Sequence, residues 1–234
     1  MSDIIDQFSD EEIERYARQL VMPEIGATGQ LDIAQAKVAI IGCGGLGANA
    51  ALTLAQSGIG QLELYDPDVV ELSNLHRQPY MEDQIGTPKV LALKDLCNSR
   101  NKKTRIQTNL NYFEGSNATL WLDCTDTYET RVQIDKLRQS RTTLIFGSVI
   151  GMDAQVTVFS AGSPGFTSIF PEAPSARVTC AAQGVLGQLA NLVAQIMAAE
   201  ALKLVTGKVS YLRDHLMLID ARDWRQTFIE KFNE

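Results

Sequence analysis

The sequence predicts an α/β protein with a doubly wound, largely parallel sheet, and two stretches carry that prediction. Residues 38–41 form an apolar, β-branched run that leads into spaced glycines and then into an Ala- and Leu-rich segment. This order is typical of a buried strand, a tight turn and a helix amino terminus. Residues 61–66 predict the next strand, which ends in Asp66, roughly 20 residues beyond the glycines, where a βαβ nucleotide unit has its ribose acid.

The turn contains Gly42, Gly44, Gly45 and Gly47. Glycine lets a backbone approach a phosphate chain closely, and the free N–H groups of a helix start favour negative charge. We therefore expect these glycines and Asp66 to bind a nucleotide. The same turn serves several nucleotide classes, so it does not identify the ligand.

The remaining pattern predicts one domain over residues 1–234, with no long polar linker to divide it. We expect a capped helix at 10–22, a link at 26–29, a nucleotide-binding core at 36–150 and a final part at 151–234. Within the final part, residues 161–179 are rich in Gly, Pro and Ser, which suits a mobile covering segment. Further predicted elements are helices at 46–57, 87–98, 127–140 and 184–205, and strands at 105–113, 120–123, 142–150, 152–159 and 212–220, with a short element at 224–232.

Composition excludes several classes of protein. The chain has 234 residues, a formal net charge of −7 and no block of Lys and Arg, which argues against a nucleic-acid surface. Its start lacks a basic segment followed by an apolar core, so we expect no secretion signal. Polar residues interrupt the apolar stretch 184–205, which favours a buried helix over a membrane span. We expect a cytoplasmic protein that binds neither nucleic acid nor membrane.

Charged residues appear where the predicted strands and helices meet. Asp123 and Asp126 follow the apolar run 120–122, and two acids so close repel each other unless one is protonated, hydrogen-bonded or facing a cation. Lys89 follows Pro88 at a helix start, where a cation is unfavourable unless an anion lies nearby. The two close acids and the lysine at a helix start would each be unfavourable without a bound ion. Both therefore favour a binding site for phosphates and their metal ion.

Four motifs together with the glycine turn resemble the ThiF/MoeB/HesA family, the bacterial relatives of ubiquitin-activating enzymes. They are residues 15–19, 73–78, 86–89 and 123–126, which follow one another in the order typical of that family. The resemblance covers about residues 10–220. It implies a Rossmann-like sheet with an antiparallel extension after residue 150, and an enzyme that uses ATP and Mg²⁺ to adenylylate a carboxylate.

The resemblance also implies the roles of individual residues. Arg18 reaches the ATP site of a partner subunit, which makes the protein a homodimer. Asn74, Arg77 and Lys89 contact the phosphates, and Asp126 lies on the side of the metal. Of the other residues in these motifs, Asp123 positions backbone, and His76 is a packing or helix-face residue.

The four cysteines, Cys43, Cys97, Cys124 and Cys180, form no Cys-x-x-Cys pair. Many members of the family carry two such pairs that hold a zinc ion, so we predict no zinc here. Cys180 matches the ThiF cysteine that can link to the activated end of the carrier. Two interpretations of Cys180 stay open: a reactive thiolate near a helix start, or an inert buried thiol.

The implied substrate is the C-terminal glycine carboxylate of a small ubiquitin-like sulfur-carrier protein that ends in Gly-Gly. The missing zinc pairs place the chain outside the best-known ThiF and MoeB members, and we favour the thiamine carrier slightly over the molybdopterin carrier. A sulfurtransferase or cysteine desulfurase would supply the sulfur. The alternatives are a peptide-activating enzyme of natural-product synthesis, a tRNA-base dehydratase, a nucleotide-binding regulator and, ranked last, a dehydrogenase.

Overall fold

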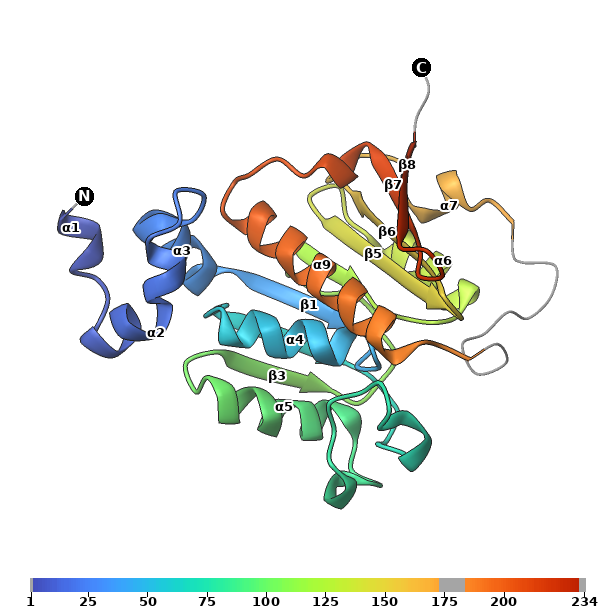
Figure 1. Ribbon diagram of the computed structural model, residues 1–234, viewed down its shortest axis with the longest axis horizontal. Helices are drawn as coiled ribbons and strands as arrows, with labels where there is room; N and C mark the ends of the chain where they lie inside the picture. The colour runs from blue at the N-terminus through green and yellow to red at the C-terminus, as the bar shows by residue number, and fades with distance from the viewer. Residues whose placement is uncertain (1, 173–183, 232–234) are drawn as a thin grey trace.

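The computed structural model describes residues 2–172 and 184–231, and one eight-stranded sheet runs through them (Figure 1). The strand order is β3-β2-β1-β4-β5-β6-β7-β8. Neighbours from β3 to β5 are parallel, and neighbours from β5 to β8 are antiparallel. The predicted parallel sheet with an antiparallel extension is therefore confirmed. The strands are β1 (Lys37–Ile41), β2 (Gln61–Tyr65), β3 (Arg105–Asn109), β4 (Leu120–Asp123), β5 (Thr143–Ile150), β6 (Asp153–Phe159), β7 (His215–Asp220) and β8 (Arg225–Glu230).

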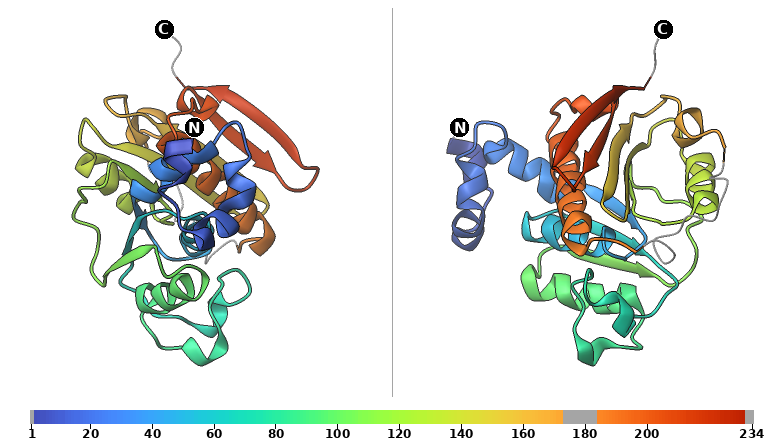
Figure 2. Two further views of the ribbon diagram at one scale, coloured as in Figure 1. Left: turned by 90° about the vertical axis from the view of Figure 1, so that its left-hand side faces the viewer. Right: turned by 45° about the vertical axis from the view of Figure 1, so that its right-hand side comes forward.

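Helices cover both faces of the sheet (Figure 2). One face carries α4 (Gly47–Gln56), α5 (Lys89–Arg100) and α9 (Gly187–Val205), and the other carries α6 (Tyr128–Leu137) and α7 (Phe166–Ile169). Successive residues of a strand point to opposite faces, so Ile40 joins the core under α4, α5 and α9, whereas Ile41 is buried with Trp121 on the opposite face. Strands buried on both faces explain the continuous apolar runs in the sequence.

The order of strands reverses at β1, which pairs with β2 on one side and with β4 on the other. The register places Ile41 opposite both Tyr65 and Asp123, so the three strands end at the same level. Open α/β sheets bind ligands beyond the carboxyl ends of the strands at such a point. The loops that follow β1, β2 and β4 are therefore brought together where a ligand is expected.

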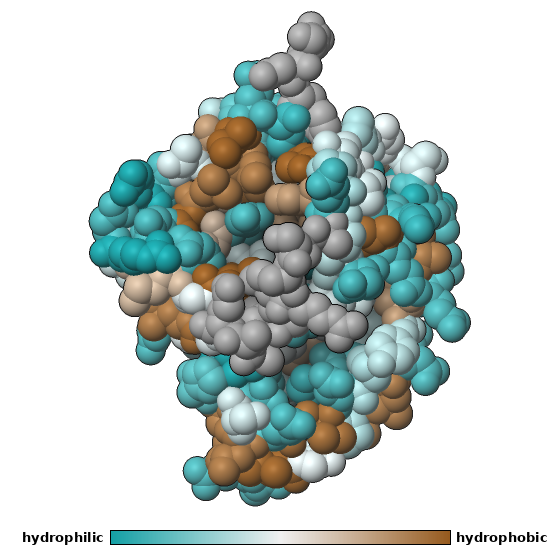
Figure 3. Space-filling model, turned by 90° about the vertical axis from the view of Figure 1, so that its right-hand side faces the viewer, coloured by the Kyte–Doolittle hydropathy of each residue, from teal (hydrophilic) through white to brown (hydrophobic). Residues whose placement is uncertain are grey.

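The loop between β2 and α5 projects from the body of the molecule at this edge (Figure 1). It contains two short 3₁₀ turns, η1 (Leu72–Asn74) and η2 (Glu82–Gln84). Its exposed apolar side chains are Val69, Leu72, Met81 and Ile85. We call this set the β2–α5 apolar patch. Figure 3 shows apolar surface at the bottom of the view.

The helices α1 (Ser2–Ile5), α2 (Asp10–Leu20) and α3 (Gly26–Gln35) precede β1. α2 begins with the expected capping box, in which Ser9 and Glu12 each accept a hydrogen bond from the other's backbone. The sequence predicted only a link at residues 26–29, and that interpretation is wrong because α3 begins there. Gln30 and Ile33 of α3 are fully buried, so tertiary packing stabilises a helix whose own sequence pattern is weak.

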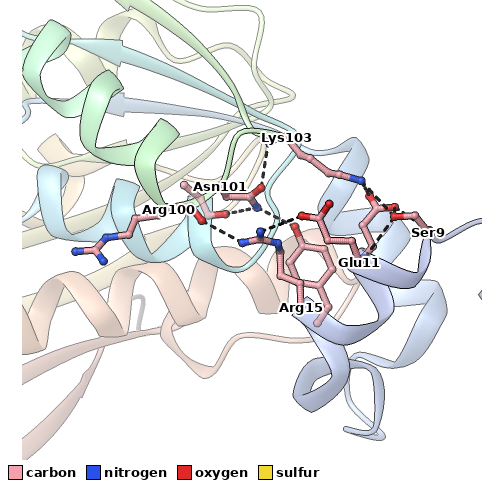
Figure 4. A network of polar contacts seen from close by, with 9 residues as sticks. Ser9, Glu11, Arg15, Arg100, Asn101 and Lys103 are labelled. Carbon is pink, nitrogen blue, oxygen red and sulfur yellow. Dashed lines mark hydrogen bonds and ion pairs between the residues drawn. The ribbon is translucent and has the colours of Figure 1, made fainter.

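Polar contacts fasten α2 to the carboxyl-terminal end of α5 (Figure 4). Arg15 Nη1 donates to the carbonyl oxygen of Arg100 over 3.1 Å, and Asn101 Nδ2 donates to the hydroxyl of Tyr16 over 2.8 Å. These contacts hold α2 at the edge of the sheet where the parallel strands begin, away from the edge where they end (Figure 1).

The predicted mobile segment at residues 161–179 is packed in its first part. Phe166 of α7 is buried, with its ring centroid 5.3 Å from that of Phe146, and Asp135 accepts a hydrogen bond from the backbone N–H of Thr167 over 3.2 Å. The prediction of mobility is therefore wrong for residues 166–170, because an aromatic contact and a carboxylate hold them against α6. Residues 173–179 lie outside the described residues.

Among the helices of the described residues, none is both long and apolar enough to cross a membrane. This includes α9, which has 19 residues and carries an ion pair between Glu200 and Lys203 at 2.6 Å. That residues 1–234 form one adenylating domain stays a prediction.

Candidate nucleotide-binding site

The glycines of the turn after β1 divide into two pairs. Gly42 has φ +89°, and a Cβ atom on Gly47 would lie 1.8 Å from the carbonyl oxygen of Gly42, so the shape of the turn requires both. A Cβ atom on Gly44 would come no closer than 3.8 Å to another group, and one on Gly45 no closer than 3.5 Å. The protein's own packing strictly requires neither Gly44 nor Gly45. Arg77 and Ala190 lie beside Gly45, whereas Gly44 has an open side that leaves room for a ligand against the backbone.

This division predicts opposite effects for two alanine substitutions. Gly47→Ala should lower the free energy of unfolding by about 2 kcal/mol or more, because the turn must shift to admit the methyl group. Gly44→Ala should keep its stability to within about 0.5 kcal/mol but bind ATP about tenfold more weakly, since its methyl group occupies the open side. Chemical denaturation and calorimetric titration with ATP measure the two effects. Unchanged ATP affinity in Gly44→Ala would contradict a nucleotide at this turn.

Asp66 fastens the glycine turn to the end of β2. Its Oδ2 accepts a hydrogen bond from the backbone N–H of Cys43 at 2.7 Å, and its Oδ1 accepts one from the N–H of Asp68 at 2.8 Å. Burial raises the pKa of the Asp66 carboxyl, and the charge of Lys89 opposes that rise. The hydroxyl of Tyr80 donates a hydrogen bond to the carbonyl oxygen of Cys43 at 2.7 Å. Asp66 thus has a structural role, and its contact with a ribose stays a prediction.

Lys89 is the first residue of α5, as the sequence predicts, and it has an anion beside it within the chain. Its Nζ lies 2.8 Å from Oδ2 of Asp68. The lysine side chain is 8% exposed and that of Asp68 is 65% exposed, so the pair opens to solvent on the side of the acid. Asp68 therefore explains how a cation is tolerated at this helix start, and a phosphate contact by Lys89 stays a prediction.

Asn74 and Arg77 lie together beside the glycine turn. Arg77 Nη2 donates to Asn74 Oδ1 at 2.8 Å, and its Nη1 donates to the carbonyl oxygen of Ser73 at 3.2 Å. The stem of Arg77 lies next to Gly45, whose absent side chain gives it space. His76 has a partner that sequence reasoning did not identify, because its Nε2 lies 3.3 Å from Arg77 Nη1. The geometry brings the two predicted phosphate contacts to the same place.

Asn49 of α4 is a site residue that sequence reasoning missed. Its Nδ2 lies 2.7 Å from the carbonyl oxygen of Gly45, 3.2 Å from that of Arg77 and 2.7 Å from Oδ1 of Asn191. It therefore links the turn, the β2–α5 loop and the start of α9. No motif spacing points to it, because its partners are far apart in the sequence.

The turn after β4 separates its two acids. Asp123 is fully buried, and its Oδ1 accepts hydrogen bonds from the N–H and hydroxyl of Thr125 at 3.0 and 2.7 Å. Arg131 Nη2 donates a hydrogen bond to the carbonyl oxygen of Thr125 at 2.7 Å. Burial raises the pKa of the Asp123 carboxyl, and the charge of Arg131 opposes that rise. Asp123 positions backbone as expected, whereas Asp126 is exposed beyond it and open to a ligand.

Arg18 does not join this site within one chain. It is exposed at the last turn of α2, which is fastened to the far end of α5. α5 has 12 residues and is therefore about 18 Å long, with Lys89 at its other end. Only another subunit could bring an Arg18 to the glycine turn.

The cysteines within the described residues are buried and free: Cys43, Cys97 and Cys124. Burial raises the pKa of Cys97 to about 12 and those of Cys43 and Cys124 well above the ordinary value, so these thiols stay protonated at neutral pH. The predicted reactive residue Cys180 lies outside the described residues. Within the described part, no group of three or more His, Cys, Asp and Glu side chains could hold a metal ion.

Comparison with known proteins agrees with this arrangement. The model of the ThiF family matches residues 16–233. The "Sulfur carrier protein adenylyltransferase" of Thermus thermophilus is 34% identical over 232 residues, which cover 92% of this chain and 86% of that protein. The "Adenylyltransferase and sulfurtransferase MOCS3" of Anopheles gambiae is 34% identical over 230 residues, and the chain spans about half of its length, 52%.

Solved structures share the fold. The crystal structure of PaaA has a TM-score of 0.78 and 25% identity, with 97% of this chain and 76% of that chain covered. The structure of Escherichia coli MccB with ATP has a TM-score of 0.82 and 20% identity, with 94% and 72% covered, and it shows the fold alone. The family match covers nearly the whole chain and confirms the resemblance read from the motifs. The chain belongs to the ThiF family.

Proposed function

We propose that this protein uses ATP to adenylylate the C-terminal carboxylate of a small ubiquitin-like sulfur-carrier protein. One observation carries the proposal: β1, β2 and β4 end at the same edge of the sheet. The open glycine turn follows β1, the acid Asp66 and the cations Arg77 and Lys89 follow β2, and the acid Asp126 follows β4. The names of the relatives from Thermus thermophilus and Anopheles gambiae support adenylylation.

In this reaction the carrier carboxylate attacks the α-phosphorus of ATP, an acyl-adenylate forms and pyrophosphate leaves. A carboxylate is already ionised near neutral pH, so no strong general base is needed. Catalysis then rests on position and on stabilising charge that develops on the phosphates. Gly44 leaves room for the phosphates and Gly45 for the stem of Arg77, Asp66 binds the ribose, and Arg77 and Lys89 neutralise phosphate oxygens.

We propose Asp126 as the residue that holds Mg²⁺ bound to the triphosphate. Magnesium in such sites needs only one or two protein carboxylates, because phosphates and waters complete its coordination. The exposed carboxylate of Asp126 fits that requirement. The ion would supply positive charge against the phosphate oxygens. The absence of zinc stays a prediction.

A groove of about 400 Å³ lies on the antiparallel part of the sheet and suits the carrier's Gly-Gly tail. Its lining includes Ser148 and Ile150 at the end of β5, Gln155 of β6, and Leu218 of β7. Asp123 at the end of β4 pairs with Phe146, two residues before Ser148 of β5, so a tail along this groove would lead toward Asp123 and Asp126. We propose the groove as the path of the tail.

We also propose a homodimer in which α2 of one subunit lies against the β2–α5 apolar patch of the other. Val21 and Met22 follow Arg18 and are exposed, so α2 offers apolar surface of its own beside the arginine. Burying apolar surface from both subunits favours association. The contact would place Arg18 at the partner's phosphates, which it cannot reach in its own chain.

The pathway is the finer part of the proposal. We favour a thiamine-pathway carrier slightly over a molybdopterin-pathway carrier, with a sulfurtransferase or cysteine desulfurase as sulfur donor and Cys180 as the residue that can bind the activated carrier. We place the reaction in the cytoplasm.

ATP–pyrophosphate exchange tests the proposal directly. The purified protein should show no exchange alone and should exchange with only one of the two carriers, each ending in Gly-Gly, because the acyl-adenylate forms reversibly on a matched carboxylate. A carrier that lacks its last glycine is the control. If neither carrier supports exchange while ATP still binds, the carrier proposal fails and peptide substrates come next.

A further inference from the structure

We propose a second ligand site, a pocket for a phosphoryl-bearing anion at the edge of the sheet where the parallel strands begin. The pocket has a volume of about 420 Å³ and is lined by the starts of β1, β4 and β5, the ends of α3 and α9, and η3 (Tyr211–Arg213). β1 has five residues and is therefore about 17 Å long, which separates this pocket from the glycine turn at its other end. The inference does not rest on the proposed adenylation.

The pocket collects positive charge from three separate elements. Lys37, Arg141 and Arg213 line it, and Asp32 is the single acid among its lining residues. Lys37 is already paired with Glu63 at 2.5 Å. Among residues 2–172 and 184–231 neither arginine has such a partner, so the excess charge of the lining is carried by guanidinium groups.

Arg213 has a guanidinium nitrogen whose hydrogen-bonding capacity the described part of the protein does not use. Its Nε is buried, and within the described residues it has no hydrogen-bond partner. A buried donor left without a partner is unfavourable, because it has lost its hydrogen bonds to water. The exposed side chain of Arg141 forms no hydrogen bond or ion pair within the described part of the chain either. Two guanidinium groups with unused donors therefore share one polar pocket.

Helix capping does not account for these arginines. The ends of α3 and α9 line the pocket, and cations often bond the last carbonyl oxygens of a helix. At the end of α9, however, Thr206 and Lys208 already donate to the carbonyl oxygens of Leu202 and Lys203. At the end of α3, the carbonyl oxygen of Ile33 accepts from backbone N–H groups. Neither arginine donates to these carbonyls.

The donor set favours a phosphoryl group. Guanidinium forks match the oxygens of phosphate in paired hydrogen bonds, and two of them can hold a dianion from different sides. The hydroxyls of Thr119 and Thr143 add neutral hydrogen-bonding groups to the lining. The volume admits either an inorganic anion, such as pyrophosphate, or the phosphate of a nucleoside monophosphate.

Calorimetric titration separates these sources and separates this pocket from the nucleotide site. Phosphate, pyrophosphate and AMP are titrated at matched ionic strength into a variant with Arg77→Ala and Lys89→Ala, in which the proposed nucleotide site is disabled. We expect binding to persist there. Adding Arg141→Gln or Arg213→Gln should weaken it by about tenfold or more, as removal of a charged hydrogen bond does.

Arg105→Gln is the matched control, because Arg105 is an exposed arginine at the start of β3, on the same edge but outside the pocket. Tighter binding of pyrophosphate would support an inorganic anion, and tighter binding of AMP a nucleotide. No binding in the double variant, or an equal loss with Arg105→Gln, would overturn the proposal. Arg141 is exposed, so Arg141→Gln decides the result if Arg213→Gln fails to fold.

Discussion

Lys89→Met should lower the rate of carrier-dependent ATP–pyrophosphate exchange by on the order of a hundredfold or more, while leaving the protein as stable as before. The loss of rate follows from the proposed role, because removing one preorganised charge aimed at developing negative charge costs about that much. The lysine side chain is 8% exposed, so methionine, which has a similar volume, keeps the stem packed while it removes the charge.

Two small contributions to the free energy of unfolding, opposite in sign, explain the unchanged stability. Asp68, the partner of Lys89, is 65% exposed on its side chain, and ion pairs open to solvent contribute about 0–1 kcal/mol. Removing a cation from the start of α5 returns a similar amount, about 0.3–1 kcal/mol, because the helix dipole disfavours positive charge there. A catalytic loss without a stability loss would therefore separate a phosphate contact from a structural lysine.

The measurement pairs exchange assays with urea denaturation for Lys89→Met and for Lys102→Met. Lys102 is exposed beyond the far end of α5, so its replacement should change neither quantity. Near-normal exchange by Lys89→Met would remove the lysine from the phosphate site. A fall in stability that matches the fall in activity would instead assign it the structural role of pairing with Asp68.

Most of the strands could be predicted from the sequence because their signals are local, whereas their order in the sheet was not predicted. Apolar runs bounded by glycines and acids mark β1, β2 and β4, and the end of each run places its first polar residue at the same edge of the sheet. The candidates Asn74, Arg77 and Lys89 were brought together for the same reason, since each follows β2 closely along the chain.

What the sequence did not predict depends on contacts between distant residues. α3 forms where the pattern is weak because Gln30 bonds the carbonyl oxygen of Ser57 and Ile33 is buried in the core. Asn49 bonds groups 28 and 142 residues away, which no motif encodes. Phe166 packs a segment whose composition is that of a loop. Tertiary packing decides each of these cases, and local pattern is silent about it.

Arg18→Ala should also lower exchange by about a hundredfold, although the residue lies at the opposite edge of its own sheet. In the proposed homodimer each site takes its arginine from the partner, so the variant lacks the charge at both sites. Arg77→Ala should be inactive for a different reason, because each site then lacks its own phosphate contact. The two variants are therefore defective in complementary halves of one composite site.

Mixing them under conditions that exchange subunits should restore activity. Random pairing makes half of the dimers hybrids, and one site in each hybrid has both Arg77 and a partner's Arg18, so about a quarter of the wild-type rate should return. Mixing Arg18→Ala with itself is the control for concentration, and Arg100→Ala controls for loss of an exposed arginine at the same edge. Activity that remains the average of the two separate variants, or a monomer by light scattering that exchanges at the wild-type rate, would show that Arg18 does not act across an interface.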